Sequence, residues 1–362
     1  MNTNNNRNTI NPISRRTFIN RSVLGTAAVA ITPATMISQN ILGIDIGGTK
    51  CAIVTGNTDT KGQIEIRSKV VFPTETAKGF NHTFQNICIN IESEIAKTGL
   101  TPKDLAAIGI SCGGPLDSKK GIIMSPPNLP GWDNIPIVDL IENRFHVKTS
   151  VQNDANACTL AEWKYGAGQG YNNVIFLTFG TGMGAGLILD GKLYAGTNDM
   201  AGEVGHIRLE RTGPVGYGKA GSFEGFCSGG GIAQLGRTLA LEKLQMGESV
   251  SFCNSIACID SIDAKLVAEA AFKGDSLAIE IYRLCGHYLG TALSVIIDIL
   301  NPEVIILGSI YCRSQELIEP AMRSVIEREA LNHSRNVCKI VPAALSEKIG
   351  DYAALSVAAC SI

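Results

Sequence analysis

The acidic side chain at position 154 stands where an expected strand passes into an expected helix. Asp154 lies in the segment NDANA (153–157), after a strand expected at Thr149–Gln152 and before a helix running to about Trp163. The positive end of a helix dipole favours an ionised carboxylate. Such a carboxylate can act as a general base that takes the proton from an attacking hydroxyl. Asp and Asn are also common N-cap residues, so the spacing leaves a structural and a catalytic interpretation open.

Two glycine-rich turns have the composition of phosphate sites. Residues 45–49 read Asp-Ile-Gly-Gly-Thr, and residues 180–184 read Gly-Thr-Gly-Met-Gly. Glycines let backbone N–H groups approach an anion without a Cβ in the way. The carboxylate of Asp45 would repel a bare phosphate, so it indicates a Mg²⁺ ion between the two. Each turn alone could be an ordinary glycine turn, and their matching places in two half-repeats favour phosphate binding.

A third group of polar residues has the chemistry to bind several hydroxyl groups. Glu203 and His206 lie in the segment EVGH, and Glu224 follows in a glycine-rich stretch. Two carboxylates and an imidazole suit hydrogen bonding to a sugar, although a lone histidine is more often structural. Asn128 lies in the segment NLPGW, which could equally be a proline-stiffened surface turn.

The elements that would position these residues alternate between strand and helix. We expect strands at 41–47, 50–56, 64–71 and 105–111, and a helix over 80–95 with Gly99 as its C-cap. A second cycle begins with a strand at 174–180, returns through GAGLILDG, and ends with a helix over 280–300 and the strand VIILG. The two cycles form an internal pseudo-repeat, and ligands of α/β folds commonly bind in the cleft between such halves.

Composition excludes several classes of protein. The chain has 362 residues, of which 45% are apolar and 18% charged, so it is globular. A net charge of -2 provides no basic field for a nucleic-acid backbone. Eleven cysteines without a CxxC pair indicate reduced thiols rather than an oxidising compartment. The longest apolar run, Cys285–Leu300, is interrupted by His287 and Asp298, so we expect no membrane-spanning helix and no membrane partner.

Residues 1–40 differ in composition from everything that follows. The stretch Ser14–Ala30, SRRTFINRSVLGTAAVA, pairs two arginines with a weakly apolar run and ends in a possible cleavage site, Ala28-Val29-Ala30. A twin-arginine export signal and a disordered tail are both consistent with this pattern.

The ordered set of motifs resembles the ROK family of bacterial sugar kinases and repressors, within the actin-like ATPase superfamily. The resemblance covers residues from about 41 to the C-terminus. It rests, in order, on LGIDIGGTK, GISCGGPLD, NLPGW, NDANACTLAEWKYGAG, LTFGTGMGAGLILDGKLYAG, EVGH and GSFEG.

The resemblance implies a two-domain α/β fold, of the actin-like ATPase (ribonuclease H-like) type, with a cleft between the domains. We expect an N-terminal domain over 41–151, completed by a C-terminal helix near 348–362, and a second domain over 152–347.

The family phosphorylates a sugar hydroxyl with ATP and Mg²⁺, so the resemblance also implies an ATP-dependent hexose kinase. By resemblance, the ATP and Mg²⁺ site contains Asp45, Gly47, Gly48, Thr49, Lys50, Thr181, Gly182 and Gly308. The positions that contact the sugar are Asn128, Asn153, Glu203, His206 and Glu224, with Asp154 as the catalytic base.

The chain departs from the family pattern at two places. Members with a structural zinc carry CxCGxxGCxE after the EVGH histidine, and here Val215, Tyr217 and Ser222 replace the three cysteines. His206 alone cannot hold a tetrahedral zinc, so we expect no metal there. Ser309 follows Gly308 where the family usually has paired glycines against the adenosine.

Two other functions remain open. The family's repressor branch needs a helix-turn-helix of roughly sixty residues or more, and about forty residues precede the first expected strand. A sugar-binding protein without turnover is the second alternative. The sugar is not specified: glucose is the family default, and hexosamines and other hexoses remain open. A homodimer is expected by analogy alone. The expected location is the cytoplasm, where ATP is available, with periplasmic export possible if the N-terminal segment is a working signal.

Overall fold

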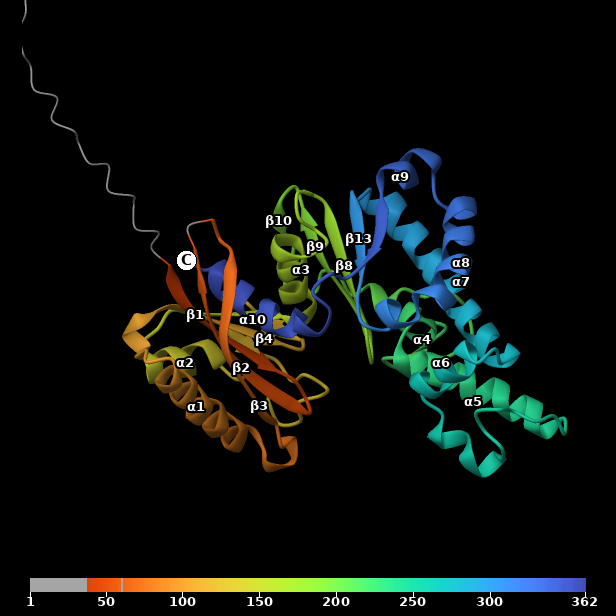
Figure 1. The fold of residues 1–362 in the computed structure, drawn as a ribbon, viewed down its shortest axis with the longest axis horizontal. Coiled ribbons are helices and arrows are strands. Elements are labelled where there is room, and N and C mark those ends of the chain that lie inside the picture. The colour runs from red at the N-terminus through yellow and green to blue at the C-terminus, as the bar shows by residue number, and fades with distance from the viewer. Residues whose placement is uncertain (1–37, 60) are drawn as a thin grey trace, which may run out of the picture. The chain divides into compact units, whose positions relative to one another are not determined.

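The computed structural model describes residues 38–59 and 61–362. The twin-arginine segment therefore lies outside the described residues, and its function as a signal stays a prediction. The described part is a mixed α/β structure built around two five-stranded sheets (Figure 1).

The first sheet has the strand order β3-β2-β1-β4-β7. Its strands are β1 (Gln39–Ile46), β2 (Lys50–Thr58), β3 (Ile64–Pro73), β4 (Leu105–Cys112) and β7 (Thr149–Asn153). The first three strands pair antiparallel, and β4 and β7 continue the sheet in parallel. Because β1 lies in the centre, the turn that follows it opens at the same sheet edge as the ends of β4 and β7.

The second sheet repeats this arrangement with the order β10-β9-β8-β13-β14. Its strands are β8 (Val174–Phe179), β9 (Met183–Leu189), β10 (Lys192–Leu193), β13 (Val304–Leu307) and β14 (Lys339–Pro342). The hairpin β8–β9 corresponds to β1–β2, and β13 and β14 join in parallel. The pseudo-repeat expected from the sequence is therefore present in the topology.

Alternation along the central strands divides each sheet between two hydrophobic cores. Leu42, Ile44 and Ile46 of β1 face the core under α1 (Phe80–Lys97) and α2 (Ile137–Phe145), whereas Ile41 faces α10 (Ile349–Ala359). The helix expected over 80–95 is α1, which buries Ile87, Ile91 and Ile95 at helical spacing. Its C-cap is Thr98, and Gly99 follows with a positive φ of 72°.

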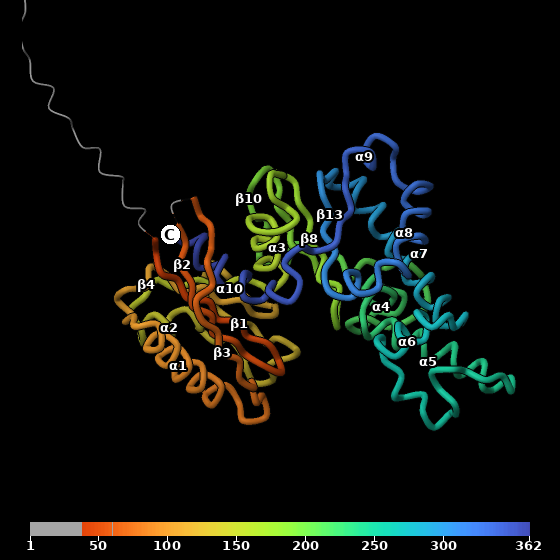
Figure 2. The backbone as a smooth tube through the Cα atoms, in the orientation of Figure 1, coloured from red at the N-terminus to blue at the C-terminus, as the bar shows by residue number. Residues whose placement is uncertain are grey.

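Two glycines allow α10 to lie directly on the first sheet. A Cβ at Gly109 would lie 2.2 Å from the backbone nitrogen of Ala358, and one at Gly43 would lie 2.8 Å from Cβ of Ala354. The tube in Figure 2 shows this last helix beside β1, although the two are more than 300 residues apart in sequence. On its other side α10 packs against α3 (Asp154–Tyr165). The division of the chain into domains at 151/152 stays a proposal.

The second sheet is covered on one face by a helical layer that contains the largest core. This layer consists of α4 (Phe223–Phe226), α5 (Gly229–Gln245), α6 (Ala264–Phe272), α7 (Ser276–Leu300) and α8 (Ile310–Glu329). The remaining elements are β5 (Leu116–Asp117), β6 (Ile122–Ile123), β11 (Val215–Gly216), β12 (Lys219–Ala220), α9 (Asn332–Val337) and the short 3₁₀ turns η1 (Thr76–Lys78), η2 (Pro102–Asp104), η3 (Val204–His206), η4 (Ile256–Ser261) and η5 (Ser346–Lys348).

Helix α7 is, by length and composition alone, long and apolar enough to cross a membrane, although we expect no membrane-spanning helix from the sequence. Half of that window is buried inside the protein, and Leu289 and Leu293 belong to the core. A Cβ at Gly286 would lie 2.4 Å from the carbonyl oxygen of Ile318, so the glycine permits close packing against α8. These contacts are those of a core helix.

Candidate active site

A pocket of about 530 Å³ collects polar residues from both sheets. The first sheet contributes the turn after β4, the loop at Asn128 and the junction between β7 and α3. The second sheet contributes the β8–β9 turn. The segment 199–206, Tyr217 and Glu224 of α4 complete the wall. Of the site residues expected from the sequence, the pocket brings together Asn128, Asn153, Asp154, Thr181, Gly182, Glu203, His206 and Glu224.

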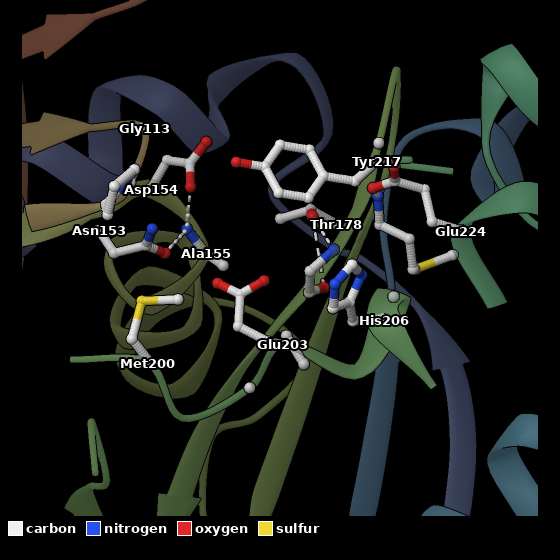
Figure 3. A pocket seen from close by; sticks show the side chains of 18 of the residues that line it. Gly113, Asn153, Asp154, Ala155, Thr178, Met200, Glu203, His206, Tyr217 and Glu224 are labelled. Atoms are coloured by element: carbon white, nitrogen blue, oxygen red, sulfur yellow. Dashed lines mark hydrogen bonds between the residues drawn. The ribbon is translucent and has the colours of Figure 1, made fainter. Parts of the chain in front are cut away.

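Helix α3 begins at the floor of this pocket with two acceptors on one donor. Asn153 is the N-cap, and its Oδ1 accepts the backbone N–H of Ala155 at 2.9 Å. Oδ1 of Asp154 accepts the same N–H at 2.8 Å. No hydrogen bond reaches Oδ2 of Asp154 within the described residues, and Figure 3 shows the carboxylate facing the pocket. The capping role therefore belongs to Asn153, and one oxygen of Asp154 remains available to a ligand.

The electrostatic environment of Asp154 favours its proton-binding form. Its side chain opens to the pocket but has protein on its other sides, and this desolvation raises the pKa of the carboxyl above its usual range. The negative charge of Glu203 raises that pKa further, while the N–H of Ala155 opposes the shift. A carboxylate with a raised pKa at a pocket floor is a candidate for a proton-transfer role.

A second set of acidic residues faces Asp154 across the pocket. Burial and the charge of Glu224 raise the pKa of Glu203, although His206 lowers it. Oε2 of Glu224 accepts the backbone N–H of Met183 at 3.0 Å, so this carboxylate also supports the β8–β9 turn. The pocket thus presents carboxylates, amides and an imidazole, a mixture of acceptors and donors that can bind a polyhydroxylated ligand.

The β8–β9 turn is held by backbone hydrogen bonds, one within the turn and one from the start of α5. The N–H of Gly180 donates to the carbonyl of Gly182 at 3.1 Å, and the N–H of Gly229 at the start of α5 donates to the carbonyl of Gly180 at 2.8 Å. Thr181 at the tip is exposed and lines the pocket.

Comparison with known protein families gives a match over nearly the whole described chain. The model of the ROK family matches residues 41–359. The chain belongs to the ROK family. The expected fold class, a two-domain α/β fold of the actin-like ATPase type, is confirmed by solved ROK kinase structures that share it.

Both branches of the ROK family are among the relatives. The chain is 29% identical to a glucokinase of Thermotoga maritima over 89% of this chain and 98% of the relative. It is 28% identical to the transcriptional dual regulator NagC of Escherichia coli over 91% of this chain and 78% of that protein. A solved ROK glucokinase from Streptomyces griseus, in complex with glucose and AMPPNP, is 30% identical with a TM-score of 0.68, covering 88% of this chain and 99% of that one.

The other residues expected at the ATP site lie outside the pocket wall. These are Asp45, Gly47, Gly48, Thr49, Lys50 and Gly308. The β1–β2 turn adjoins the pocket through Asn128, because a Cβ at Gly48 would lie 2.6 Å from the Asn128 carbonyl oxygen. Gly308 directly follows β13 of the second sheet, and its N–H donates to the carbonyl of Leu177 at 3.0 Å.

Asp45 has the surroundings of a cation site. It lies in β1 opposite Ala52, one residue before the strand ends. Burial and the charges of Asp154 and Asp351 raise its pKa to about 6, while Lys69 acts in the opposite direction. Carboxylate oxygens are the ligands that Mg²⁺ prefers, so this donor chemistry fits the ion expected from the sequence.

The residues after EVGH do not fit a structural zinc. Val215, Tyr217 and Ser222 occupy the positions of the three cysteines, and only His206 remains as a ligand. No group of three or more His, Cys, Asp or Glu side chains able to hold a metal occurs in the described part of the chain.

Several pocket residues were not expected as site residues, among them Tyr217, Asp199 and Met200. Tyr217 was interpreted only as packing within its loop, and Asp199 and Met200 were not singled out. Asp199 accepts both the backbone N–H and the hydroxyl of Ser118, at 2.7 and 2.8 Å. Its loop is thereby joined to the β5–β6 turn. No local motif marks this contact, because the two residues are 81 positions apart.

Proposed function

We propose that this chain is an ATP-dependent sugar kinase that transfers the γ-phosphoryl group to a hexose or hexosamine hydroxyl, with glucose as the first candidate. The observation that carries the proposal is the uncommitted oxygen of Asp154, which faces a pocket between hydroxyl-binding residues and a glycine turn. The similarity to glucokinases, one of them solved with glucose and AMPPNP, supports the same reaction.

The sugar would lie against the wall formed by Asn128, Asn153, Glu203, His206 and Glu224. Oδ1 of Asn153 caps α3, which leaves its amide nitrogen as the group that can donate to a hydroxyl. Glu203 offers both carboxylate oxygens, whereas Glu224 offers mainly Oε1 because Oε2 holds the N–H of Met183. Acceptors around a pocket of this size discriminate hydroxyl-rich ligands from apolar ones.

Catalysis would consist mainly of positioning and proton transfer. Oδ2 of Asp154 would accept a hydrogen bond from the attacking hydroxyl and take its proton. The hydroxyl oxygen would then bond to the γ-phosphorus as the bond from that phosphorus to the bridging oxygen breaks and ADP leaves. Thr181 and the backbone of the β8–β9 turn would hold the phosphates in line with that hydroxyl, and Gly47, Gly48, Thr49 and Lys50 would contribute from the β1–β2 turn. Gly308 would lie on the nucleotide side. Asp45 would hold Mg²⁺, which supplies neutralisation of phosphate charge when bound.

The test is an ADP-release assay with MgATP over a panel of glucose, N-acetylglucosamine, N-acetylmannosamine, mannose, fructose and allose. We expect sugar-dependent ADP release that Asp154→Asn abolishes while calorimetry still detects sugar binding. ADP release that is independent of sugar, or equal in the Asp154→Asn variant, would contradict the proposal.

The similarity to NagC favours one alternative, a sugar-responsive regulator or a sugar-binding protein with weak catalysis. The same pocket wall would bind the sugar in either case. This alternative predicts sugar binding without ADP release, so the same two measurements distinguish it from the kinase.

We infer a cytoplasmic location and a homodimer as further parts of this proposal. All eleven cysteines are free thiols in the structure, which suits a reducing compartment, and ATP is available there. Fractionation tests the location, since a cleaved periplasmic pool would show that the N-terminal segment is an export signal. Light scattering tests the oligomeric state.

A further inference from the structure

A short hairpin carries an aromatic side chain into the pocket wall. Strands β11 and β12 pair antiparallel, and Tyr217 and Gly218 form the two-residue turn between them. Both turn residues have positive φ, 43° and 76°, as a type I′ hairpin turn requires. Positive φ is unfavourable for a large side chain such as tyrosine, so the surrounding structure must hold this conformation.

Three contacts hold the hairpin without a metal. The side-chain amide of Gln234 on α5 accepts the N–H of Val215 at 2.9 Å and donates to its carbonyl at 2.8 Å. The ammonium group of Lys219 donates to the carbonyl of His206 at 2.7 Å. A Cβ at Gly216 would lie 2.6 Å from the backbone nitrogen of Gly225, so the hairpin packs closely against α4. The hairpin therefore packs against α4 and is hydrogen-bonded to α5 and to the turn that carries His206.

The tyrosine ring contributes nothing to the core. Its exposed fraction is 70%, and it lines the pocket with Glu203 and His206. Its ring meets the His206 imidazole edge-on, with centroids 5.8 Å apart and planes at 63°. Figure 3 shows the ring directed across the pocket, with its hydroxyl toward the side that carries Asp154. A rigidly mounted aromatic face left open above polar groups has the chemistry to cover the apolar C–H face of a sugar ring.

We propose that Tyr217 is a sugar-binding residue of this chain. Its ring packs on the C–H face of the hexose while Glu203 and His206 bind the hydroxyls, and its edge contact with the imidazole keeps His206 in position. The residue occupies the place of a zinc cysteine, so the hairpin performs by packing what other members achieve with a metal. This inference rests on the proposed sugar site.

The experiment compares Tyr217→Ala and Tyr217→Phe in the full chain, with Val215→Ala as the matched control. Val215 lies in the same hairpin, its side chain is exposed, and it is outside the pocket wall. We expect Tyr217→Ala to raise KM and Kd for the sugar about tenfold, with kcat and KM for ATP within about twofold of the parent. Tyr217→Phe retains the ring and should bind like the parent, as should Val215→Ala.

Each other outcome has a defined meaning. Unchanged sugar affinity in Tyr217→Ala overturns the proposal, and so does an equal loss in Tyr217→Phe, which would assign the effect to the hydroxyl. An equal loss in Val215→Ala would show that the hairpin acts only as a scaffold and would also overturn it. Calorimetry with glucose, mannose and N-acetylglucosamine separates the two claims. If the parent chain binds sugar without releasing ADP, the kinase proposal fails, but the binding data still test the role of Tyr217. If the parent chain binds none of these sugars, both proposals are overturned.

Discussion

The carboxylate of Glu224 accepts the backbone N–H of Met183 at 3.0 Å. This hydrogen bond joins α4, where we propose that the sugar binds, to the β8–β9 turn, where we propose that the phosphates bind. A Cβ at Gly182 would lie 2.8 Å from the same carboxylate oxygen, so the glycine allows the approach. One side chain therefore supports both halves of the proposed site, and its replacement should affect both.

Glu224→Ala is expected to raise KM for both sugar and ATP, because it removes a hydroxyl acceptor and releases the turn. It should also lower the free energy of unfolding by about 1.5 kcal/mol, the contribution of a hydrogen bond to a charged group. Glu224→Gln retains an acceptor for Met183 and should recover most of the ATP affinity. Steady-state kinetics and urea denaturation provide the measurements, and a selective effect on sugar KM alone would contradict the link.

Asp154→Asn is expected to lower kcat by about 100-fold or more and to leave sugar Kd within a few-fold of the parent. The variant should also have a higher Tm at pH 7. Burial raises the pKa of Asp154 in the folded state above its value in the unfolded chain. The protonated carboxyl therefore contributes fully to folding stability below the unfolded pKa, and this contribution is lost as pH rises through the folded pKa.

The amide is neutral at every pH. The gain in Tm should therefore vanish at about pH 3, below the ordinary aspartate pKa of about 3.9, where the parent carboxyl is protonated in both states. Calorimetric melting at pH 7 and at about pH 3 measures the difference. An equal or lower Tm at pH 7 would show that Asp154 stabilises the fold as an ion.

On the acid side of the pH profile (the acid limb), kcat should fall with a midpoint above the usual pKa range of a carboxyl group. Asp154 must be ionised to act as a base, and its pKa is raised. Glu203→Gln should move this limb to lower pH at saturating sugar, since the charge of Glu203 contributes to the shift. Asp45 also titrates nearby, with a pKa of about 6, but Glu203 is not among the groups that shift it. Movement of the limb therefore excludes Asp45 as its source, and a limb unaffected by Glu203→Gln would exclude Asp154.

Ser118→Ala is expected to raise the sugar KM about threefold to tenfold, as loss of one hydrogen bond would. Asp199 accepts both the hydroxyl and the N–H of Ser118, and its loop continues into Met200 and Glu203 of the pocket wall. The hydrogen bond from the Ser118 N–H to Asp199 should remain in this variant, so kcat should change little. Ser118→Thr keeps the hydroxyl and is the control, and a loss of kcat without a change in KM would show a different role for this contact.

Treatment with a zinc-selective chelator should leave sugar Kd, kcat and Tm unchanged at constant Mg²⁺. Only His206 remains of the four ligands, and the hairpin is held by Gln234 and Lys219 instead. Elemental analysis of the purified chain should find substoichiometric zinc. A lower Tm after chelation would show a zinc site built from other residues.

Local sequence patterns were sufficient to predict most of the main helices and strands and to identify the family. Period-two and period-3.6 patterns predicted β1, β2, β4, β8, α1 and α7 to within a few residues of their ends, because burial on one face imposes those periods. Composition alone does not distinguish a buried core helix such as α7 from a membrane-spanning helix. The ordered motifs identified the ROK family, since glycine turns and polar clusters at fixed places are hard to obtain by chance.

The tertiary structure decided which oxygen of which side chain faces the pocket. Sequence spacing left Asp154 as either cap or base. The structure assigns the cap to Asn153, because Asn153 immediately precedes the first helical residue and its Oδ1 accepts the N–H of Ala155. Glu224 accepts the N–H of Met183, which is 41 positions away in the sequence, and Asp199 accepts the N–H of Ser118, which is 81 positions away. No local sequence pattern predicts contacts over such separations. Tyr217 likewise became a pocket residue only through a hairpin whose position depends on α4 and α5. The sequence alone determines which chemical groups are present and the local elements that carry them. Which side chains come together in one pocket depends on how the two sheets and their helices pack.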